Sequence, residues 1–270
     1  MTKRIHWLIE RGVIGDDKIE AMAVQLDQEG IGYDIFRTIP FSHDIADPVP
    51  QLSGDETVIC YGSTSAQGAC KARGWLPASW TGPEIDETRV QAALGPRYLN
   101  ADAFAARLRE LTPDMLPDPA FIKPDGDTKL FSGHLTSRAD FAAWRERMLN
   151  SPEIEPGAGD TMVIVAAPKE FGCEWRFFVV DGQIASACCY RQYGEVMPER
   201  WVPEAASDFV RDCIAAYDPL PAYALDITQI ADGSYRVLEI NTMNNSGFYA
   251  CEPGRIVAAI NRMLARTGDA

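Results

Sequence analysis

The chain has 270 residues, of which 46% are hydrophobic, and it carries a formal net charge of −14 at pH 7. This length suffices for two modest domains or one large one. The negative charge disfavours the phosphate-dominated contacts of nucleic-acid-binding proteins, and no apolar run approaches the roughly 18 residues of a membrane-spanning helix.

Alternating strand and helix patterns occupy the N-terminal region. Strands are predicted at residues 4–9, 33–39 and 57–61, and helices at 16–28 and 64–73. This order predicts a small α/β domain over residues 1–98 with a mainly parallel sheet. Ligands collect at the carboxyl ends of such strands, which singles out residues 10–12 and 62–64, although both segments also fit ordinary turns.

The second predicted domain covers residues 99–270, after a stretch at 74–99 that is rich in Pro, Gly and Trp and is interpreted as a connection. Helices are predicted at residues 101–111, 137–149, 203–216 and 253–265, strands at 121–124 and 162–167, and hairpins at 175–190 and 224–241. Together with the first domain, this predicts a mixed α/β (α+β) fold with antiparallel hairpins in its second part.

The cysteine pattern indicates a reducing compartment. Seven cysteines are present, an odd number with no CxxC pair, so we expect reduced thiols that are mostly buried. Only three histidines occur, none at ligand spacing, which argues against a zinc site. No secretory signal is visible at the start. We therefore expect a cytoplasmic protein with no nucleic-acid or membrane partner.

The hairpin at 224–241 carries the most informative polar residues. With Asp232 and Gly233 as a two-residue loop, Asp226 falls opposite Glu239, and Asn241 points to the same face. Opposed carboxylates destabilise a sheet unless they are neutralised, and a hard cation such as Mg²⁺ would neutralise them. The pattern predicts either a metal site or a solvated hairpin face.

The hairpin at 175–190 carries arginines. With Asp181 and Gly182 as its loop, Glu174 opposes Cys189 and Arg176 opposes Ala187. Glu174, Arg176, Cys189 and Arg191 would then share one face. Arginine suits the binding of carboxylate or phosphate, although a surface ladder of ion pairs would also produce this pattern.

Two lysines lie near the predicted strand at 121–124. Lys123 ends the strand and Lys129 lies in the following loop, which also contains Gly126 and Gly133. Lysines in such positions suit phosphate charge. The segment lacks the P-loop spacing and the dinucleotide-binding spacing of glycines.

Taken in order, these residues resemble the ATP-grasp superfamily, in particular its small phage- and bacteria-encoded carboxylate–amine ligase-like branch. The resemblance covers residues 118–254 and rests on five segments. These are Ile122-Lys123-Pro124, the loop 128–133, the strand 163–167, Gly172-Cys173-Glu174, and Leu225-Asp226 with Leu238-Glu239-Ile240-Asn241. Departures are the absence of an acidic residue at 166–167, few glycines in the loop, and Thr242-Met243 after Asn241 where Pro-Gly is common.

The resemblance implies ATP and Mg²⁺ as cofactors, with ATP between two small sheets. Its implied roles are phosphate binding by Lys123 and Lys129, backbone contacts to adenine at Ala166 and Ala167, and ribose binding by Glu174. Arg176, Arg191 and Lys129 would be catalytic, and Asp226, Glu239 and Asn241 would hold the metal.

The resemblance further implies an ATP-dependent ligase that joins a carboxylate to an amine through an acylphosphate, with small-molecule or peptide substrates. An ATP-dependent kinase on the same scaffold and a non-catalytic ATP-binding protein are the alternatives. His134 would touch a phosphate or be a plain loop residue, and residues 244–247 would line the acceptor pocket or form a turn.

Overall fold

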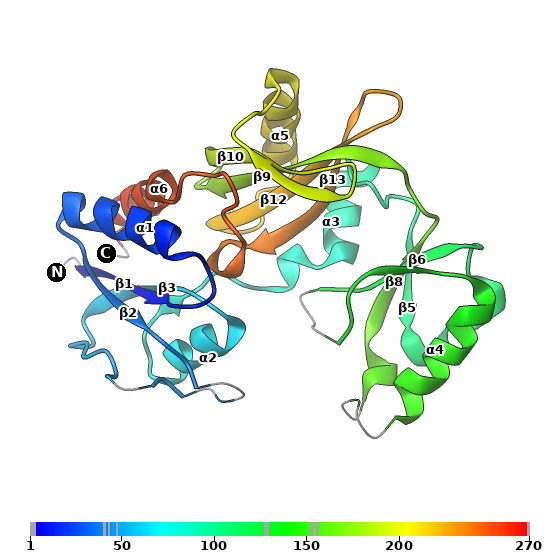
Figure 1. The fold of residues 1–270 in the computed structure, drawn as a ribbon, viewed down its shortest axis with the longest axis horizontal. Coiled ribbons are helices and arrows are strands. Elements are labelled where there is room, and N and C mark those ends of the chain that lie inside the picture. Colours follow the sequence, from blue (N-terminus) through cyan, green and yellow to red (C-terminus); the bar gives the residue numbers. More distant parts are fainter. Residues whose placement is uncertain are drawn as a thin grey trace. The chain divides into compact units, whose positions relative to one another are not determined.

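The structure is a computed structural model that describes residues 4–39, 42, 44–46, 48–126, 130–151, 154 and 157–268 (Figure 1). Its strands are β1 (Arg4–Glu10), β2 (Gly32–Phe36), β3 (Glu56–Tyr61), β4 (Pro77–Ala78), β5 (Phe104–Arg107), β6 (Ala120–Pro124), β7 (His134–Thr136), β8 (Met162–Ala166), β9 (Phe171–Val180), β10 (Gln183–Gln192), β11 (Glu195–Glu199), β12 (Ala222–Ile230) and β13 (Tyr235–Thr242). Its α-helices are α1 (Asp16–Glu29), α2 (Thr64–Ala72), α3 (Glu87–Leu94), α4 (Arg138–Asn150), α5 (Glu204–Ala216) and α6 (Pro253–Thr267). Among the described residues, no helix has both the length and the apolar character needed to cross a membrane.

The chain divides into two compact units that do not follow a single cut in the sequence. The first unit consists of Met1–Thr81, Cys173–Asp226 and Asn241–Ala270, and the second of Gly82–Gly172 and Ile227–Ile240. The predicted domains, 1–98 and 99–270, stay a prediction.

A parallel sheet of order β2-β1-β3-β4 forms the N-terminal part of the first unit. Successive residues of β1 point to opposite faces. Trp7 and Ile9 pack in a core with α1 and α6, whereas Leu8 packs with Val58 and Cys60 in a core that includes α2. Both faces of this sheet are therefore covered, as parallel sheets require, and α1 lies beside α6 in Figure 1.

Antiparallel strands make up the rest of the structure. A five-stranded sheet has the order β11-β10-β9-β12-β13, and a four-stranded sheet has the order β5-β8-β6-β7. In the second unit α4 covers the four-stranded sheet, because Phe141 and Met148 pack against Ile122, Val163 and Val165. These sheets confirm the predicted combination of a parallel α/β part with antiparallel hairpins.

Two predictions between residues 74 and 111 were wrong. The segment interpreted as a connection contains the helix α3, and the helix predicted at 101–111 is the strand β5 followed by a 3₁₀ turn at Leu108–Glu110. Residues of β5 pair with β8, with Ala105 beside Ile164. Pairing with a buried strand outweighs the helix propensity of the alanines in this segment.

Candidate functional site

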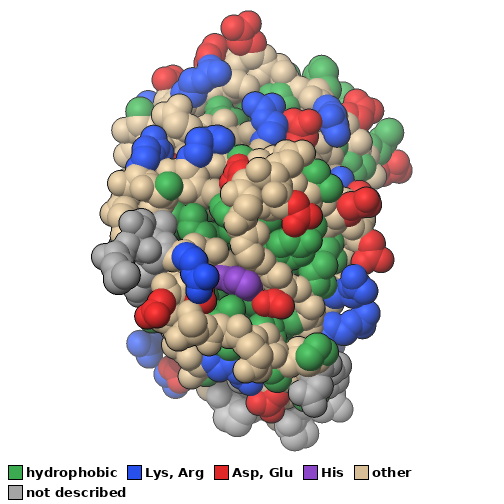
Figure 2. All heavy atoms as spheres, turned by 90° about the vertical axis from the view of Figure 1, so that its left-hand side faces the viewer, with side chains coloured by type: hydrophobic (Ala, Val, Ile, Leu, Met, Phe, Trp, Pro, Cys, Tyr) green, Lys and Arg blue, Asp and Glu red, His purple; other side chains and the backbone are tan. Residues whose placement is uncertain are grey.

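Charge is finely mixed on the surface of the molecule. On the face shown in Figure 2, Lys and Arg side chains lie among Asp and Glu side chains rather than in a field of one sign. Screening weakens such exposed charges. The cations best placed to bind an anionic ligand are therefore the buried ones, Lys123 and Arg176.

Arg176 of β9 is a fixed cation in the first unit. Its Nε donates to Asp226 Oδ1 at 2.8 Å and its Nη2 donates to Asp226 Oδ2 at 2.6 Å, while Nη1 donates to the Gly247 carbonyl at 3.2 Å. Its guanidinium carbon lies 5.4 Å from the centroid of the Tyr190 ring and 5.2 Å from that of Tyr249. Two hydrogen bonds to one carboxylate and two aromatic rings together fix the orientation of this guanidinium.

Asp226 of β12 is fully buried beside Arg176. Burial disfavours the charged guanidinium, but the Asp226 carboxylate outweighs burial and raises the pKa of Arg176. The pair therefore stays charged, and each partner compensates the desolvation of the other.

The register of the β9–β10 hairpin corrects the predicted one. Asp181 and Gly182 form the predicted two-residue loop, but two bulges follow, so that Glu174 lies opposite Arg191 and Arg176 opposite Cys188. Cys189 lies opposite Trp175 and leaves the predicted face. Each bulge inserts one residue that a strict count of two along the strand does not anticipate.

The second bulge places a tyrosine beside Glu174. Tyr190 donates its hydroxyl to Glu174 Oε2 at 2.5 Å, and Arg191 Nη1 lies 3.6 Å from Glu174 Oε1. Burial, together with the nearby Asp226 and Glu174 carboxylates, raises the pKa of the Tyr190 hydroxyl, which keeps it a donor. Glu174 is itself buried, so its carboxylate is held at a defined orientation.

Lys123 is the buried cation of the second unit. It lies near the end of β6, and its Nζ is 2.5 Å from Glu87 Oε1 and 3.4 Å from Glu239 Oε2. Burial alone would lower the pKa of Lys123, but the Glu87 and Glu239 carboxylates outweigh it and raise that pKa. The ammonium group is therefore charged at neutral pH and shared between two carboxylates.

Glu87 is the residue of this cluster that the sequence did not reveal. It lies in the first turn of α3, within a segment that was interpreted as a connection. A helix start at Asp86 was the only available signal, because Asp is favoured at the residue before a helix. Nothing in the sequence indicated that this turn lies beside Lys123.

The predicted metal ligands are divided between the two units. Asp226 and Asn241 belong to the first unit and Glu239 to the second. The turn before β13 differs from the prediction, since Ile230 N donates to the Ser234 carbonyl and Gly233 N donates to the Ile230 carbonyl. This three-residue loop does not give the alignment of Asp226 with Glu239 that a two-residue loop would give. Within the described parts of the chain, no three His, Cys, Asp or Glu side chains gather as a metal cluster.

The remaining predicted contacts are backbone atoms and one lysine. Ala166 ends β8 and is buried, whereas Ala167 is exposed and its carbonyl accepts a hydrogen bond from Lys169 Nζ at 3.0 Å. Lys129 lies outside the described residues.

The two turns at the carboxyl ends of β1 and β3 are joined to each other. Glu10 is buried, and its Oε2 accepts from the backbone N–H of Ser63 at 2.6 Å. The Ser63 hydroxyl accepts from Ala66 N at 3.2 Å, so that Ser63 caps α2. These polar groups satisfy one another, which favours the interpretation of residues 10–12 and 62–64 as structural turns.

Asn244 has a structural role. It is fully buried, and its side-chain amide donates to the Cys60 carbonyl at 2.6 Å and to the Ala78 carbonyl at 3.2 Å. Its Oδ1 accepts from Trp80 N at 3.3 Å. Asn244 therefore fastens the turn after β13 to β3 and β4, and its amide is engaged by the protein itself.

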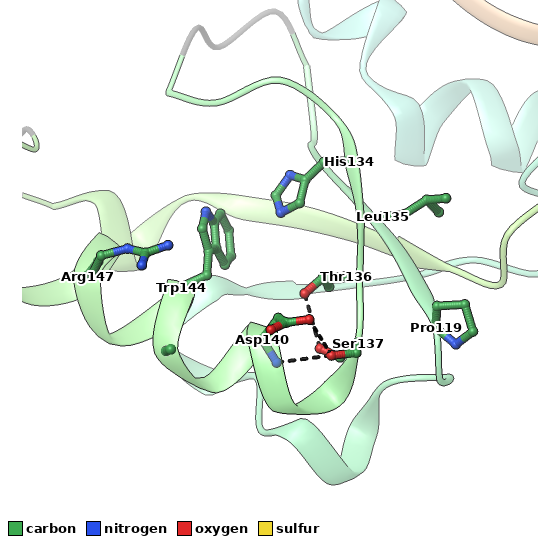
Figure 3. A pocket seen from close by; sticks show the side chains of 9 residues that line it. Pro119, His134, Leu135, Thr136, Ser137, Asp140, Trp144 and Arg147 are labelled. Atoms are coloured by element: carbon green, nitrogen blue, oxygen red, sulfur yellow. Dashed lines mark hydrogen bonds between the residues drawn. The ribbon is translucent and has the colours of Figure 1, made fainter. Parts of the chain in front are cut away.

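A pocket of about 460 Å³ lies between β7 and α4 in the second unit (Figure 3). The His134 and Trp144 rings lie next to each other there, with centroids 5.0 Å apart, and Arg147 lines the same pocket. Of the predicted residues only His134 lines it. Its Nδ1 lies 3.1 Å from the Ser132 carbonyl, a short-range contact typical of a loop residue.

The sequence matches a known family over most of its length. The match is to an ATP-grasp domain, clade family 3, over residues 57–260, which is more than half of the 270 residues. The chain therefore belongs to this ATP-grasp family. The match begins well before residue 118, so the family's domain includes part of the region that carried no specific motif.

Solved ATP-grasp structures share the fold. D-cycloserine synthetase DcsG is 14% identical with a TM-score of 0.68, and the alignment covers 96% of this chain and 99% of that chain. D-alanine–D-alanine ligase from Bacillus anthracis, complexed with ATP, is 16% identical with a TM-score of 0.64 and 99% coverage of both chains. The ATP-grasp ligase PsnB, complexed with a minimal precursor, is 17% identical with a TM-score of 0.59, covering 97% and 99%. No curated protein matches the sequence. Family and fold confirm the resemblance inferred from the sequence.

Proposed function

We propose that this protein is an ATP- and Mg²⁺-dependent ligase that joins a carboxylate to an amine through an acylphosphate. The observation that carries the proposal is the match to an ATP-grasp family over residues 57–260. The fold shared with three ATP-dependent or ATP-grasp ligases and synthetases supports it. The buried, oriented cations Lys123 and Arg176 supply what phosphoryl transfer needs, namely positioning and charge neutralisation.

The proposed reaction has two steps. A substrate carboxylate oxygen attacks the γ-phosphorus of ATP, the bond to the bridging oxygen breaks, and ADP leaves. The amine nitrogen then attacks the acyl carbon, phosphate leaves, and the nitrogen loses a proton as the amide forms. Both steps place negative charge on phosphate oxygens, which fixed cations stabilise more cheaply than mobile water does.

Residue roles follow the chemistry of each side chain. Lys123 and Lys129 would bind phosphates, and Arg176 and Arg191 would stabilise the charge of the transferred group. The buried Glu174 carboxylate would accept from ribose hydroxyls, for which its fixed orientation suits it. Ala166 and Ala167 would offer backbone atoms to adenine.

The donor types at the proposed metal site fit Mg²⁺, because carboxylate and amide oxygens are its preferred protein ligands. Glu239 fits best, since its side chain is 38% exposed and its contact to Lys123 is long, at 3.4 Å. Asn241 would add an amide oxygen. Both oxygens of Asp226 accept from Arg176, so Asp226 would hold the metal and the guanidinium together. When bound, Mg²⁺ would neutralise phosphate charge.

The substrates are proposed by class. The solved structures include a D-alanine–D-alanine ligase, a D-cycloserine synthetase, and PsnB complexed with the precursor peptide PsnA2. We infer small-molecule or peptide carboxylates and amines for this chain. A cytoplasmic location is proposed as well, because all seven cysteines are free thiols, which fits a reducing compartment.

The test is phosphate release from ATP by the full chain across a grid of carboxylates and amines. A ligase releases phosphate only when both substrate classes are present. A stable phosphorylated product that forms without an amine would indicate a kinase instead. ATP binding without turnover across the grid would leave a nucleotide-binding protein and contradict the ligase proposal.

A further inference from the structure

Glu87 makes the shortest contact of the Lys123 cluster. Glu87 Oε1 lies 2.5 Å from Lys123 Nζ, whereas Glu239 Oε2 lies 3.4 Å from it. A charge-assisted hydrogen bond has its optimum near the shorter distance. Lys123 is therefore bound mainly to Glu87, and its contact with Glu239 is the weaker of the two.

The carboxylate of Glu87 is held in an unfavourable environment. The residue is only 6% exposed, and its second oxygen, Oε2, is buried without a hydrogen-bond partner among the described residues. Burying a carboxylate oxygen without a partner costs stability. An apolar residue would satisfy folding better at this place, so the contact with Lys123 requires another reason.

Glu87 is rigidly placed with respect to Lys123. Thr88 N donates to Asp125 Oδ1 at 3.2 Å and the Thr88 hydroxyl donates to Asp125 Oδ2 at 2.9 Å. The residue after Glu87 is thus fastened to a residue just after Lys123. Both ends of the contact are therefore fixed through the backbone, which is the requirement for positioning a flexible side chain.

The two carboxylates compete for one ammonium group. Without Glu87, Lys123 would pair with Glu239 alone and would occupy the oxygen that the proposed metal needs. It would also regain side-chain freedom, which would weaken nucleotide binding because that freedom is lost again in the complex. Glu87 prevents both effects by holding Lys123 away from Glu239.

We infer that Glu87 is a positioning residue that orients Lys123 toward the nucleotide phosphates and keeps Glu239 available for the metal. The inference rests on the proposed function, because it assigns a role to Glu87 in the same nucleotide site. Asp86, Asp125 and Glu239 are the other acidic groups that surround the pair.

The test is the affinity of the full chain for Mg²⁺ with a non-hydrolysable ATP analogue, measured by calorimetry in a double-mutant cycle. Glu87→Gln should weaken binding about tenfold in the wild-type background and have no effect in a Lys123→Met background. Glu84→Gln, a neighbouring acidic residue whose side chain is 43% exposed, is the matched control and should bind as the wild type does.

Equal weakening by Glu87→Gln in both backgrounds, or no weakening in either, would overturn the inference. A fall in the melting temperature of Glu87→Gln together with equal weakening would assign Glu87 a merely structural role.

A second readout separates this inference from the proposed function. The chain has six lysines, so reductive methylation with ¹³C gives a resolvable NMR spectrum. Without nucleotide, the Lys123 methyl signal should shift in Glu87→Gln and stay in place in Glu84→Gln. An unmoved signal overturns the positioning of Lys123. A shifted signal in a chain that binds no nucleotide upholds the positioning and removes the proposed function.

Discussion

Buried charges in this protein occur as pairs with defined geometry. Arg176 has Asp226 and Lys123 has Glu87, and all four side chains are largely shielded from water. Such pairs add little to net stability, but the loss of one partner leaves an uncompensated charge. Polar residues of this kind are retained where function needs a fixed charge, which fits the proposed binding of phosphates.

Glu87 predicts a pH-dependent stability. Burial raises the pKa of Glu87 to about 7 from 4.5, with Lys123 opposing the shift. The folded chain therefore binds this proton more tightly than the unfolded chain does. The associated stability is complete below about pH 4.5 and is lost as the pH rises through about 7.

Replacing Glu87 by Gln removes this titration. The free energy of unfolding of Glu87→Gln, relative to wild type, should therefore increase by up to about 3 kcal/mol between about pH 5 and about pH 8. Urea unfolding at a series of pH values measures it. A difference that stays constant with pH, as expected for Glu84→Gln, would contradict the burial of an ionisable Glu87.

Asp226 predicts a large loss of stability. Asp226→Asn keeps the size of the side chain but leaves the buried Arg176 without its counterion, so the free energy of unfolding should fall by about 3–5 kcal/mol. Asp208→Asn removes an exposed ion pair with Arg211 on α5 and is the matched control. It should change stability by less than about 1 kcal/mol. Equal midpoints of urea unfolding for the two variants would show that the Arg176–Asp226 pair carries no such energy.

At the scale of elements, the sequence predicted most of the strands and helices correctly, because hydrophobic periodicity reports burial. The turn Asp181-Gly182 was also readable, since both residues adopt positive φ. Bulges were not readable, because one inserted residue such as Tyr190 leaves no mark in composition. For the same reason, Glu174 was placed opposite the wrong partner although its own strand was predicted.

Residues that meet only through tertiary structure were harder to predict. The strand β5 depends on pairing with β8, and Glu87 meets Lys123 only because α3 is fastened to the loop after β6. Lys123 and Arg176 were identified from the sequence because they lie on predicted strands. Of their partners, Glu87 was missed and Asp226 was assigned a different role.

The cap of α2 provides a prediction for an element. Ser63→Ala removes the side-chain acceptor of Ala66 N–H, so the free energy of unfolding should fall by about 1 kcal/mol. Ser65→Ala changes the same residue type just inside α2 and should be neutral or slightly stabilising, since Ala has the higher helix propensity. Thermal or urea unfolding of both variants decides the matter, and a Ser65→Ala that loses as much as Ser63→Ala would contradict the cap.

The whole molecule contains a covered parallel sheet and antiparallel sheets, and its family is that of ATP-grasp domains. The fold defines a nucleotide-dependent class, whereas the substrates depend on side chains that differ between ligases of the same fold. The proposed ligase activity therefore depends on whether this chain binds ATP through the residues named above.

Calorimetric titration of the full chain with Mg²⁺ and a non-hydrolysable ATP analogue tests this claim most directly. We expect saturable binding for the wild type and for Lys71→Ala, whose side chain contacts Thr81 on the surface. Lys123→Ala should bind at least about tenfold more weakly, because it loses the buried cation proposed to bind the phosphates. Absence of binding by the wild type, or equal affinity of Lys123→Ala, would contradict the proposed nucleotide site.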